Sequence, residues 1–189
     1  MTGSTATPTV YVALLRAVNL GSHGKVPMAG LQSWCEDLGF ADVVTYIQSG
    51  NVVFTAVGTD EDEVGVVLGD RIEQECGVRT PVLVRRGDEL EAAVAANPLH
   101  DVAIEPKFLH VAFLAEAPST DRVAALDPDR SPPDVFVVDG RHVYLHYPGG
   151  SGRSKLTNDY LERTLGTVST ARNWNTVRTL LDMVREREP

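Results

Sequence analysis

The sequence predicts an α+β protein built from two successive β-α-β-β-α-β units, followed by an extra C-terminal helix. Two β-hairpin signals carry this prediction, Ser49-Gly50-Asn51 and Asp139-Gly140, each lying between runs of strand-forming residues. The third observation is that strand and helix patterns follow the same order around both hairpins. Two split β-α-β units in tandem are typical of a tandem ferredoxin-like protein, or pair of α/β plaits.

In the first half, β-branched and apolar runs predict strands, and apolar residues at helical spacing predict helices between them. Pro27 stands where a first helical residue should, Gly39 stops that helix, and Asp60 can cap the next one. Gly65 and Gly69 weaken this second helix by about 1 kcal/mol each relative to Ala. The elements are expected at residues 10–15, 27–38, 43–48, 52–56, 61–76 and 81–84.

In the hairpin between residues 43 and 56, Gly50 and Asn51 can take the positive φ that a tight turn needs. Gln48, Ser49 and Asn51 also place three neutral hydrogen-bonding side chains at its tip. A purely structural turn needs fewer. The tip is therefore a candidate polar site.

The second half repeats the pattern after a linker. Asp88 and Glu91 stand at capping-box spacing at the start of a short helix, which Asn97-Pro98 ends. Asn173 can cap the last helix, on which Trp174 and further apolar residues share a face. The elements are expected at residues 108–114, 119–126, 135–138, 141–147, 155–165, 168–171 and 174–184. The predicted domains are a loose tail at 1–9, subdomains at 10–86 and 107–189, and the linker at 87–106.

Length and composition fit a soluble globular protein. The 189 residues are 43% hydrophobic and 23% charged, and no run of about 18 apolar residues could span a membrane. Cys35 and Cys76 lie far apart on predicted helices, which is typical of buried thiols in a reducing cytoplasm. A cytoplasmic protein without disulfides is therefore expected.

The net charge of −9 opposes attraction to nucleic-acid phosphates. The charge is uneven, because Ser151–Pro189 holds seven Arg and Lys against five acids, a local balance of +2. A compact anion could therefore still be accepted by the C-terminal part.

Two glycine-containing loops leave a strand beside a lysine. Arg16 and Asn19 precede the segment 21–25, which ends in Lys25 and leads into a helix. Loop amides, a helix N-terminus and a lysine favour an anion, although the spacing is not that of a P-loop. The alternative is a tight turn with a solvated lysine.

Segment 148–155 repeats this arrangement in the second half, with Ser154 and Lys155 at its end. Here the alternative to an anion site is simple helix capping by Ser154. Two of the three lysines of the chain, Lys25 and Lys155, thus lie in glycine-rich loops that lead into helices.

Segment 170–176 is the densest polar cluster, at a junction of strand and helix. Capping by Asn173 and core packing by Trp174 explain two of its residues. Thr170, Arg172, Asn175 and Thr176 have no structural role in the pattern. A guanidinium there could bind carboxylate or phosphate with two hydrogen bonds, or pair with a neighbouring acid.

The sequence assigns no catalytic residue, cofactor or metal. His142 and His146 lie four apart on a strand, about 13 Å from each other, and so cannot chelate one metal. His110, within a buried strand, is expected to be a core histidine.

Several of these motifs together resemble a known family. The chain resembles the bacterial family known as domain of unknown function 1697 (DUF1697) in five motifs: Arg16-Ala17-Val18-Asn19-Leu20-Gly21, Lys25-Val26-Pro27-Met28, the hairpin from Tyr46 to Phe54, Ser154-Lys155-Leu156 and Thr170-Ala171-Arg172-Asn173-Trp174-Asn175-Thr176. The resemblance runs from about Val10 to Val184 and implies a pair of ferredoxin-like plaits. It implies no reaction.

The resemblance also indicates site residues. Where the family pattern has glycine, this chain carries Ala17 and Ser22. The polar positions of the family's motifs are taken as one shared site formed between the two halves, and they fall here on Arg16, Asn19, Gln48, Ser49, Asn51, Ser154, Lys155, Thr170, Arg172 and Asn173.

Three functions compete. The first is binding of a small anionic ligand, bearing phosphate or carboxylate, at this polar site together with Lys25; it requires Arg16, Ser49, Lys155 and Arg172 to line one cleft. The second is a non-catalytic regulatory or interaction module that pairs with a partner or as a homodimer. The third is nucleic-acid binding, since an RNA-recognition domain is also a plait, but the hairpin lacks the aromatic stacking residues and the chain is acidic.

Overall fold

The structure is a computed structural model and describes residues 7–20, 24–99 and 105–188. The start of the predicted tail, most of the first glycine-containing loop with Ser22, and part of the predicted linker lie outside these residues. The chain divides into two compact units, the first from the N-terminal part to Glu91 together with the residues from Leu180, the second Ala92–Thr179. The chain passes between the units within helices α3 and α6.

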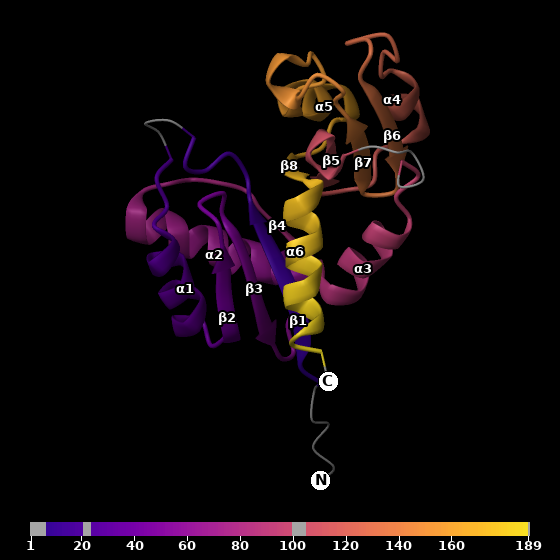
Figure 1. Ribbon diagram of the computed structural model, residues 1–189. Helices are drawn as coiled ribbons and strands as arrows, with labels where there is room; N and C mark the ends of the chain where they lie inside the picture. The colour runs from indigo at the N-terminus through magenta and orange to yellow at the C-terminus, as the bar shows by residue number, and fades with distance from the viewer. Residues whose placement is uncertain (1–6, 21–23, 100–104, 189) are drawn as a thin grey trace. The chain divides into compact units, whose positions relative to one another are not determined.

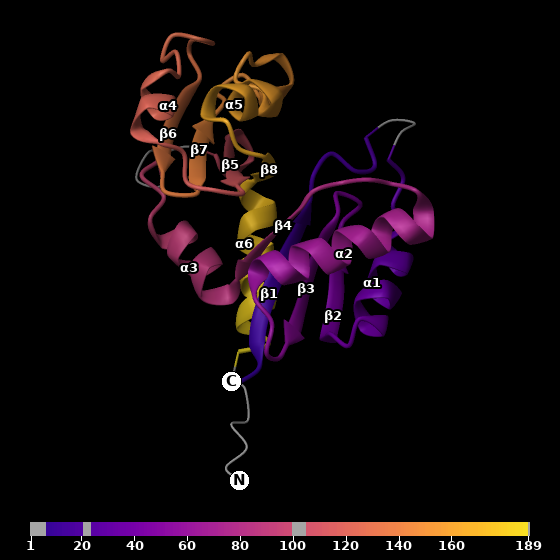
Figure 2. The same cartoon turned by 180° about the vertical axis from the view of Figure 1, so that it is seen from behind.

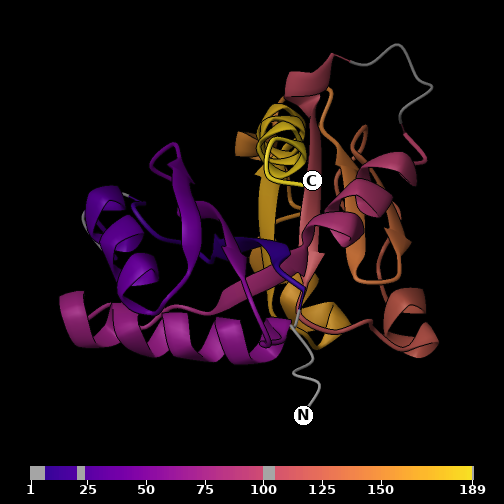
Figure 3. The same ribbon diagram turned by 90° about the horizontal axis from the view of Figure 1, so that it is seen from below.

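Unit 1 is a β-α-β-β-α-β fold. Its strand order is β2-β3-β1-β4 with all neighbours antiparallel, which is the arrangement of a ferredoxin-like plait. Helices α1 and α2 cover one face of this sheet (Figures 2 and 3). The elements are β1 Thr9–Leu15, α1 Met28–Asp37, β2 Ala41–Tyr46, β3 Asn51–Ala56, α2 Glu61–Cys76 and β4 Val82–Arg86, followed by α3 Gly87–Ala95.

The core of unit 1 follows from strand alternation. Tyr11, Ala13 and Leu15 point from β1 toward the helices and pack with Leu31 of α1 and Leu68 of α2. The residues between them on β1 are also buried, so both faces of this strand are apolar. This explains why β1 is a continuous hydrophobic run.

Unit 2 repeats the topology (Figure 1). Its strand order is β6-β7-β5-β8, again antiparallel throughout, and α4 and α5 pack against one face. The elements are β5 Leu109–Leu114, α4 Thr120–Ala124, β6 Val135–Asp139, β7 His142–His146, α5 Asn158–Leu165 and β8 Ser169–Asn173, followed by α6 Trp174–Arg185. Two short 3₁₀ turns lie at Pro106–Phe108 and Ser151–Arg153. The predicted fold class, tandem ferredoxin-like with an added helix, is confirmed.

Two local predictions are wrong. At the first hairpin, positive φ falls on Ile47 and Gly50, while Asn51 is the first residue of β3 and completely buried. The helix expected from Lys155 begins only at Asn158, because Thr157 caps it by accepting a hydrogen bond from the Tyr160 amide.

Candidate functional site

Asn19 joins three segments of unit 1. Its side-chain amide donates to the carbonyl oxygens of Val26 (3.0 Å) and Gln48 (2.8 Å), and its Oδ1 accepts from the Val26 amide (2.9 Å). The backbone of Asn19 has φ 58°, a left-handed conformation that asparagine tolerates better than most residues. Asn19 therefore ties the end of β1 to the start of α1 and to the hairpin tip.

The hairpin tip packs closely on the chain that leaves β1. A Cβ on Gly50 would lie 2.6 Å from the Val18 side chain and 2.7 Å from Leu15, and the Leu15 amide donates to the Gly50 carbonyl (2.8 Å). Asn51 donates to the Tyr46 carbonyl (3.0 Å) and so closes the hairpin from within. Gln48 and Ser49 remain exposed at the tip.

Arg16 stands at the end of β1 with its backbone held on both sides. Its amide donates to the Pro81 carbonyl (3.0 Å), and its carbonyl accepts from the Thr80 hydroxyl (2.7 Å). Arg16 is half-buried. The strand end is thus fixed by the segment that precedes β4.

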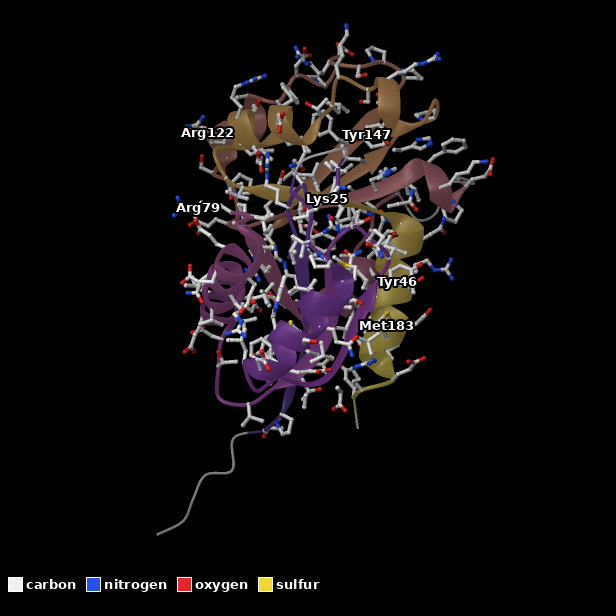
Figure 4. The ribbon with its side chains drawn as sticks, turned by 90° about the vertical axis from the view of Figure 1, so that its left-hand side faces the viewer. Lys25, Tyr46, Arg79, Arg122, Tyr147 and Met183 are labelled. Carbon is white, nitrogen blue, oxygen red and sulfur yellow. The ribbon has the colours of Figure 1, made fainter. Side chains whose placement is uncertain are left out.

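A depression of about 340 Å³ lies between the end of β1, the start of α1 and the hairpin tip, and we call it the α1 depression. It is lined by Asn19, Lys25, Val26, Pro27 and Gln48. Lys25 is exposed on the loop that leads into α1 (Figure 4). Among the described residues no hydrogen bond or ion pair is recorded for its ammonium group.

The N-terminus of α1 has backbone N–H groups that make no hydrogen bond within the helix. Pro27 provides no side-chain cap, and no acidic residue occupies the first turn. The first backbone hydrogen bond runs from the Leu31 amide to the Pro27 carbonyl (2.9 Å), so the amides before it have no partner within the helix. A helix N-terminus of this kind carries a partial positive charge.

In unit 2, the predicted residues form two separate groups. The first lies before α5, where Ser131 Oγ accepts from the Lys155 amide (3.0 Å) and donates to Asp134 (2.7 Å). Ser154 Oγ accepts from the Leu156 amide (2.9 Å), and the Lys155 side chain is exposed. Ser154 thus organises the loop rather than capping α5.

The second group lies on β8. Ala171 packs against the helix-covered core, so strand alternation turns Thr170 and Arg172 to the opposite face of the sheet. Arg172 is 7% exposed and donates to Thr170 Oγ1 (2.7 Å) and the Ala171 carbonyl (3.0 Å). Burial lowers the pKa of Arg172 to about 10, which still leaves the guanidinium charged at neutral pH.

Asn173 has a structural role at the end of β8. Its Oδ1 accepts from the Asn175 amide (3.0 Å), as a helix cap does, and its Nδ2 donates to the Lys107 carbonyl (2.9 Å). The predicted capping role is thereby confirmed.

The structure brings Asn19, Lys25 and Gln48 together around the α1 depression, with Arg16, Ser49 and Asn51 on the segments that support it. In unit 2, Ser154 and the Lys155 amide bond Ser131, whereas Arg172 bonds Thr170 on β8. Each group is held by its own local contacts.

Sequence reasoning missed Ser131 as the hub of its loop and Thr80 as the anchor of Arg16. A signal for Ser131 was present, since it opens the turn Ser131-Pro132-Pro133-Asp134, and Ser, Pro and Asp are typical turn residues. Nothing around Thr80 indicates its partner, 64 residues away in the chain.

The described part of the chain shows neither a cluster of metal ligands nor a membrane-spanning helix. In residues 7–20, 24–99 and 105–188, no group of three or more His, Cys, Asp and Glu side chains is arranged to hold a metal ion. None of the helices in this part of the chain has the length and apolar character needed to cross a bilayer.

Comparisons with known proteins identify the family. The structure is similar to that of a conserved bacterial protein from Streptococcus pneumoniae, with a TM-score of 0.64 and 22% sequence identity over 94% of this chain and 99% of that chain. At 22% identity, this similarity establishes only that the two proteins share a fold. No curated protein matches the sequence. A family model described as a protein of unknown function, DUF1697, matches residues 9–144, and the chain therefore belongs to the DUF1697 family.

Proposed function

We propose that the protein binds a small anionic ligand, bearing phosphate or carboxylate, at the α1 depression. The observation that carries this proposal is the exposed Lys25 ammonium beside an uncapped helix start without acidic residues. Amides at a helix N-terminus and a nearby cation are the elements of many anion sites. The ligand contacts proposed here are Lys25, the first amides of α1 and the side chain of Gln48.

Preorganisation supports the proposal. The three hydrogen bonds of Asn19 hold the Val26 backbone and the hairpin tip in place before any ligand arrives. Because these groups are already ordered, binding costs less conformational entropy. A modest set of contacts can then give a measurable affinity.

Thermal unfolding with a panel of ligands tests the proposal. Orthophosphate, a nucleoside monophosphate, a sugar phosphate, an acyl phosphate and a dicarboxylate are added to the wild type and to Lys25→Gln. A ligand at about 100 times its dissociation constant adds roughly 2.7 kcal/mol, a rise of several degrees in Tm. Lys25→Gln should lose this rise. The control Lys107→Gln, which removes an exposed lysine of unit 2, should keep it.

A second variant separates ligand binding from stability. Ala29→Glu places a carboxylate on an exposed position of the first turn of α1, where it stabilises the helix by about 0.3–1 kcal/mol. The same carboxylate repels an anion in the α1 depression. The variant should therefore unfold at a higher temperature than the wild type without ligand and show no rise with it. The anion site would be refuted if no ligand raised the Tm of the wild type, or if the ligands raised the Tm of Lys25→Gln by as much as that of the wild type.

A second candidate function is a protein-interaction module, favoured by the edge strand β6. Val135–Asp139 begins with four apolar residues, Val135 is 46% exposed, and β6 has no bulge of the kind that interrupts β2. Within the described part of the chain no strand pairs with its outer edge. Light scattering tests self-association. If the wild type is a dimer and Val137→Lys is a monomer, β6 forms the interface. If the wild type is a monomer at all concentrations, the protein does not act as a homodimer through β6.

A further inference from the structure

The residues that line the α1 depression carry a single charge. Lys25 is positive, and the other lining residues, Asn19, Val26, Pro27 and Gln48, are neutral. The volume of about 340 Å³ is at the small end of the range for ligand pockets. A ligand with one anionic group matches this charge and this size. The several charges of a polyphosphate would find no further cation in the lining.

The polar groups of the lining are largely used within the protein. Both N–H groups of the Asn19 side chain are donated to the carbonyl oxygens of Val26 and Gln48, and its Oδ1 accepts from the Val26 amide. Pro27 has no N–H group, and its carbonyl oxygen accepts from the Leu31 amide. A ligand body with several hydroxyl groups would find few partners here, and buried hydroxyl groups without partners weaken binding. The lining therefore favours an apolar body.

Ile47, at the edge of the α1 depression, has an unusual backbone conformation. It directly precedes Gln48 at the hairpin tip, and its φ of 48° is an outlier for a β-branched residue. Asparagine or glycine would adopt this conformation with less strain. Burial does not account for the isoleucine, because 47% of its surface is exposed. Strained residues of this kind cluster at sites that contact ligands.

A second exposed apolar residue lies at the same edge. Leu20 directly follows Asn19 in the chain and is 68% exposed. Because the Asn19 side chain bonds the Gln48 carbonyl oxygen at 2.8 Å, the segments that carry Leu20 and Ile47 are held together beside the α1 depression. We call these two residues the apolar rim. The rim adds apolar surface next to a lining whose charge comes from Lys25.

We propose that the anion bound at the α1 depression carries an apolar body, so that the ligand is a small alkyl or aryl phosphate or the corresponding carboxylate. The anionic group lies at Lys25, and the apolar body lies against Val26, Pro27 and the apolar rim. This inference rests on the proposed function, because it names the class of ligand for the same site. It ranks sugar phosphates and nucleoside triphosphates below an alkyl phosphate.

Three probes with the same phosphate group test the body of the ligand: orthophosphate, glycerol 1-phosphate and propyl phosphate. The last two both have three carbons and differ by two hydroxyl groups. Isothermal titration calorimetry should give propyl phosphate an affinity about tenfold above that of the other two, with a more negative heat-capacity change on binding. Equal affinities for all three probes would leave the anion site in place and overturn the apolar body. Binding of none of them would refute the anion site itself, and this inference with it.

Variants of the apolar rim locate the contact. Ile47→Asn suits the left-handed backbone, so its Tm without ligand should be no lower than that of the wild type. It should bind orthophosphate as the wild type does and lose most of the preference for propyl phosphate, and Leu20→Asn should weaken this preference as well. Val57→Asn is the matched control, because Val57 is 56% exposed and follows β3 at the other end of the hairpin. The control should keep the preference. An unchanged preference in both rim variants would overturn the proposed contacts.

Discussion

Gly65 on α2 lies so close to β4 that a Cβ at this position would stand 2.8 Å from the Val82 carbonyl oxygen. Real Cβ atoms do not approach a backbone oxygen to this distance, so helix and strand can only be this close because residue 65 has no side chain. Gly69, one turn further along the same helix, has its nearest neighbour at 3.7 Å, the carbonyl of Thr80. The close packing of α2 on β4 therefore requires glycine at position 65 but not at position 69.

We expect opposite effects from alanine at these two positions. Gly69→Ala should raise the free energy of unfolding by about 1 kcal/mol, because alanine has the better helix propensity and its Cβ makes an ordinary contact. Gly65→Ala should lower it by roughly 1–3 kcal/mol, because α2 must move away from β4. Urea unfolding of both variants measures the difference. Equal stabilisation by both substitutions would show that α2 and β4 have room to separate.

Because Asn19 makes three side-chain hydrogen bonds, we expect different substitutions at this position to lower the free energy of unfolding by different amounts. Asn19→Gly keeps the left-handed backbone accessible and loses the side-chain bonds, so it should cost about 2–3 kcal/mol of unfolding free energy. Asn19→Asp replaces a donor by an acceptor facing the carbonyls of Val26 and Gln48, and should cost more. Urea unfolding ranks the two. If Asn19→Asp is as stable as the wild type, the hydrogen bonds from Asn19 to the two carbonyl oxygens contribute little to the free energy of unfolding.

The backbone at Ala17 has φ 52°, a conformation that favours glycine. A left-handed residue with a Cβ destabilises the folded protein by roughly 1–2 kcal/mol, and glycine removes this strain. Glycine also makes the unfolded chain more flexible, which lowers the free energy of unfolding by about 0.4–1 kcal/mol. Ala17→Gly should therefore stabilise the protein by about 0.5 kcal/mol. Ala29→Gly is the control, since at an exposed position in α1 it should destabilise by about 1 kcal/mol. A loss of stability in both variants would contradict the argument.

Position 17 also shows what a sequence can and cannot predict. Strand and helix order in both units follows from hydrophobic period and turn residues, because these are local properties, and that part was predictable. The family pattern has glycine at position 17, and the structure shows a left-handed backbone there although the residue is alanine.

The candidate site was less predictable, because its contacts join segments far apart in the chain. The sequence indicates Asn19 and Gln48 as polar candidates, but only the fold shows that the Asn19 amide bonds the Gln48 carbonyl, 29 residues away. The same holds for the burial of Asn51, which looked like a turn residue and lies in β3. The helix start predicted at Lys155 is wrong for a local reason, since Thr157, three residues after Ser154, is an equally good cap.

His110 gives a prediction about acid stability. Its ring packs edge-on against Tyr147 at 5.2 Å, and its Nδ1 is buried without a hydrogen-bond partner in the described part of the chain. Burial lowers the pKa of His110, and the polar backbone of nearby Phe108 opposes this shift only in part. The folded protein therefore holds His110 neutral, and the unfolded chain takes up a proton first as the pH falls through about 6.5.

The stability that His110 contributes is accordingly complete above pH 6.5 and is lost as the pH falls below it. Other groups also titrate in this range, so the comparison is between the wild type and His110→Gln, which shares all of them. Urea unfolding at pH 7.5, 6.5, 5.5 and 5.0 should show the wild type losing more unfolding free energy than the variant, with the gap widening toward low pH. Parallel pH profiles would mean that His110 has the same proton affinity folded and unfolded. A wild type that loses less than the variant would mean that the folded protein holds the imidazolium, and burial would then not be the dominant influence on this residue.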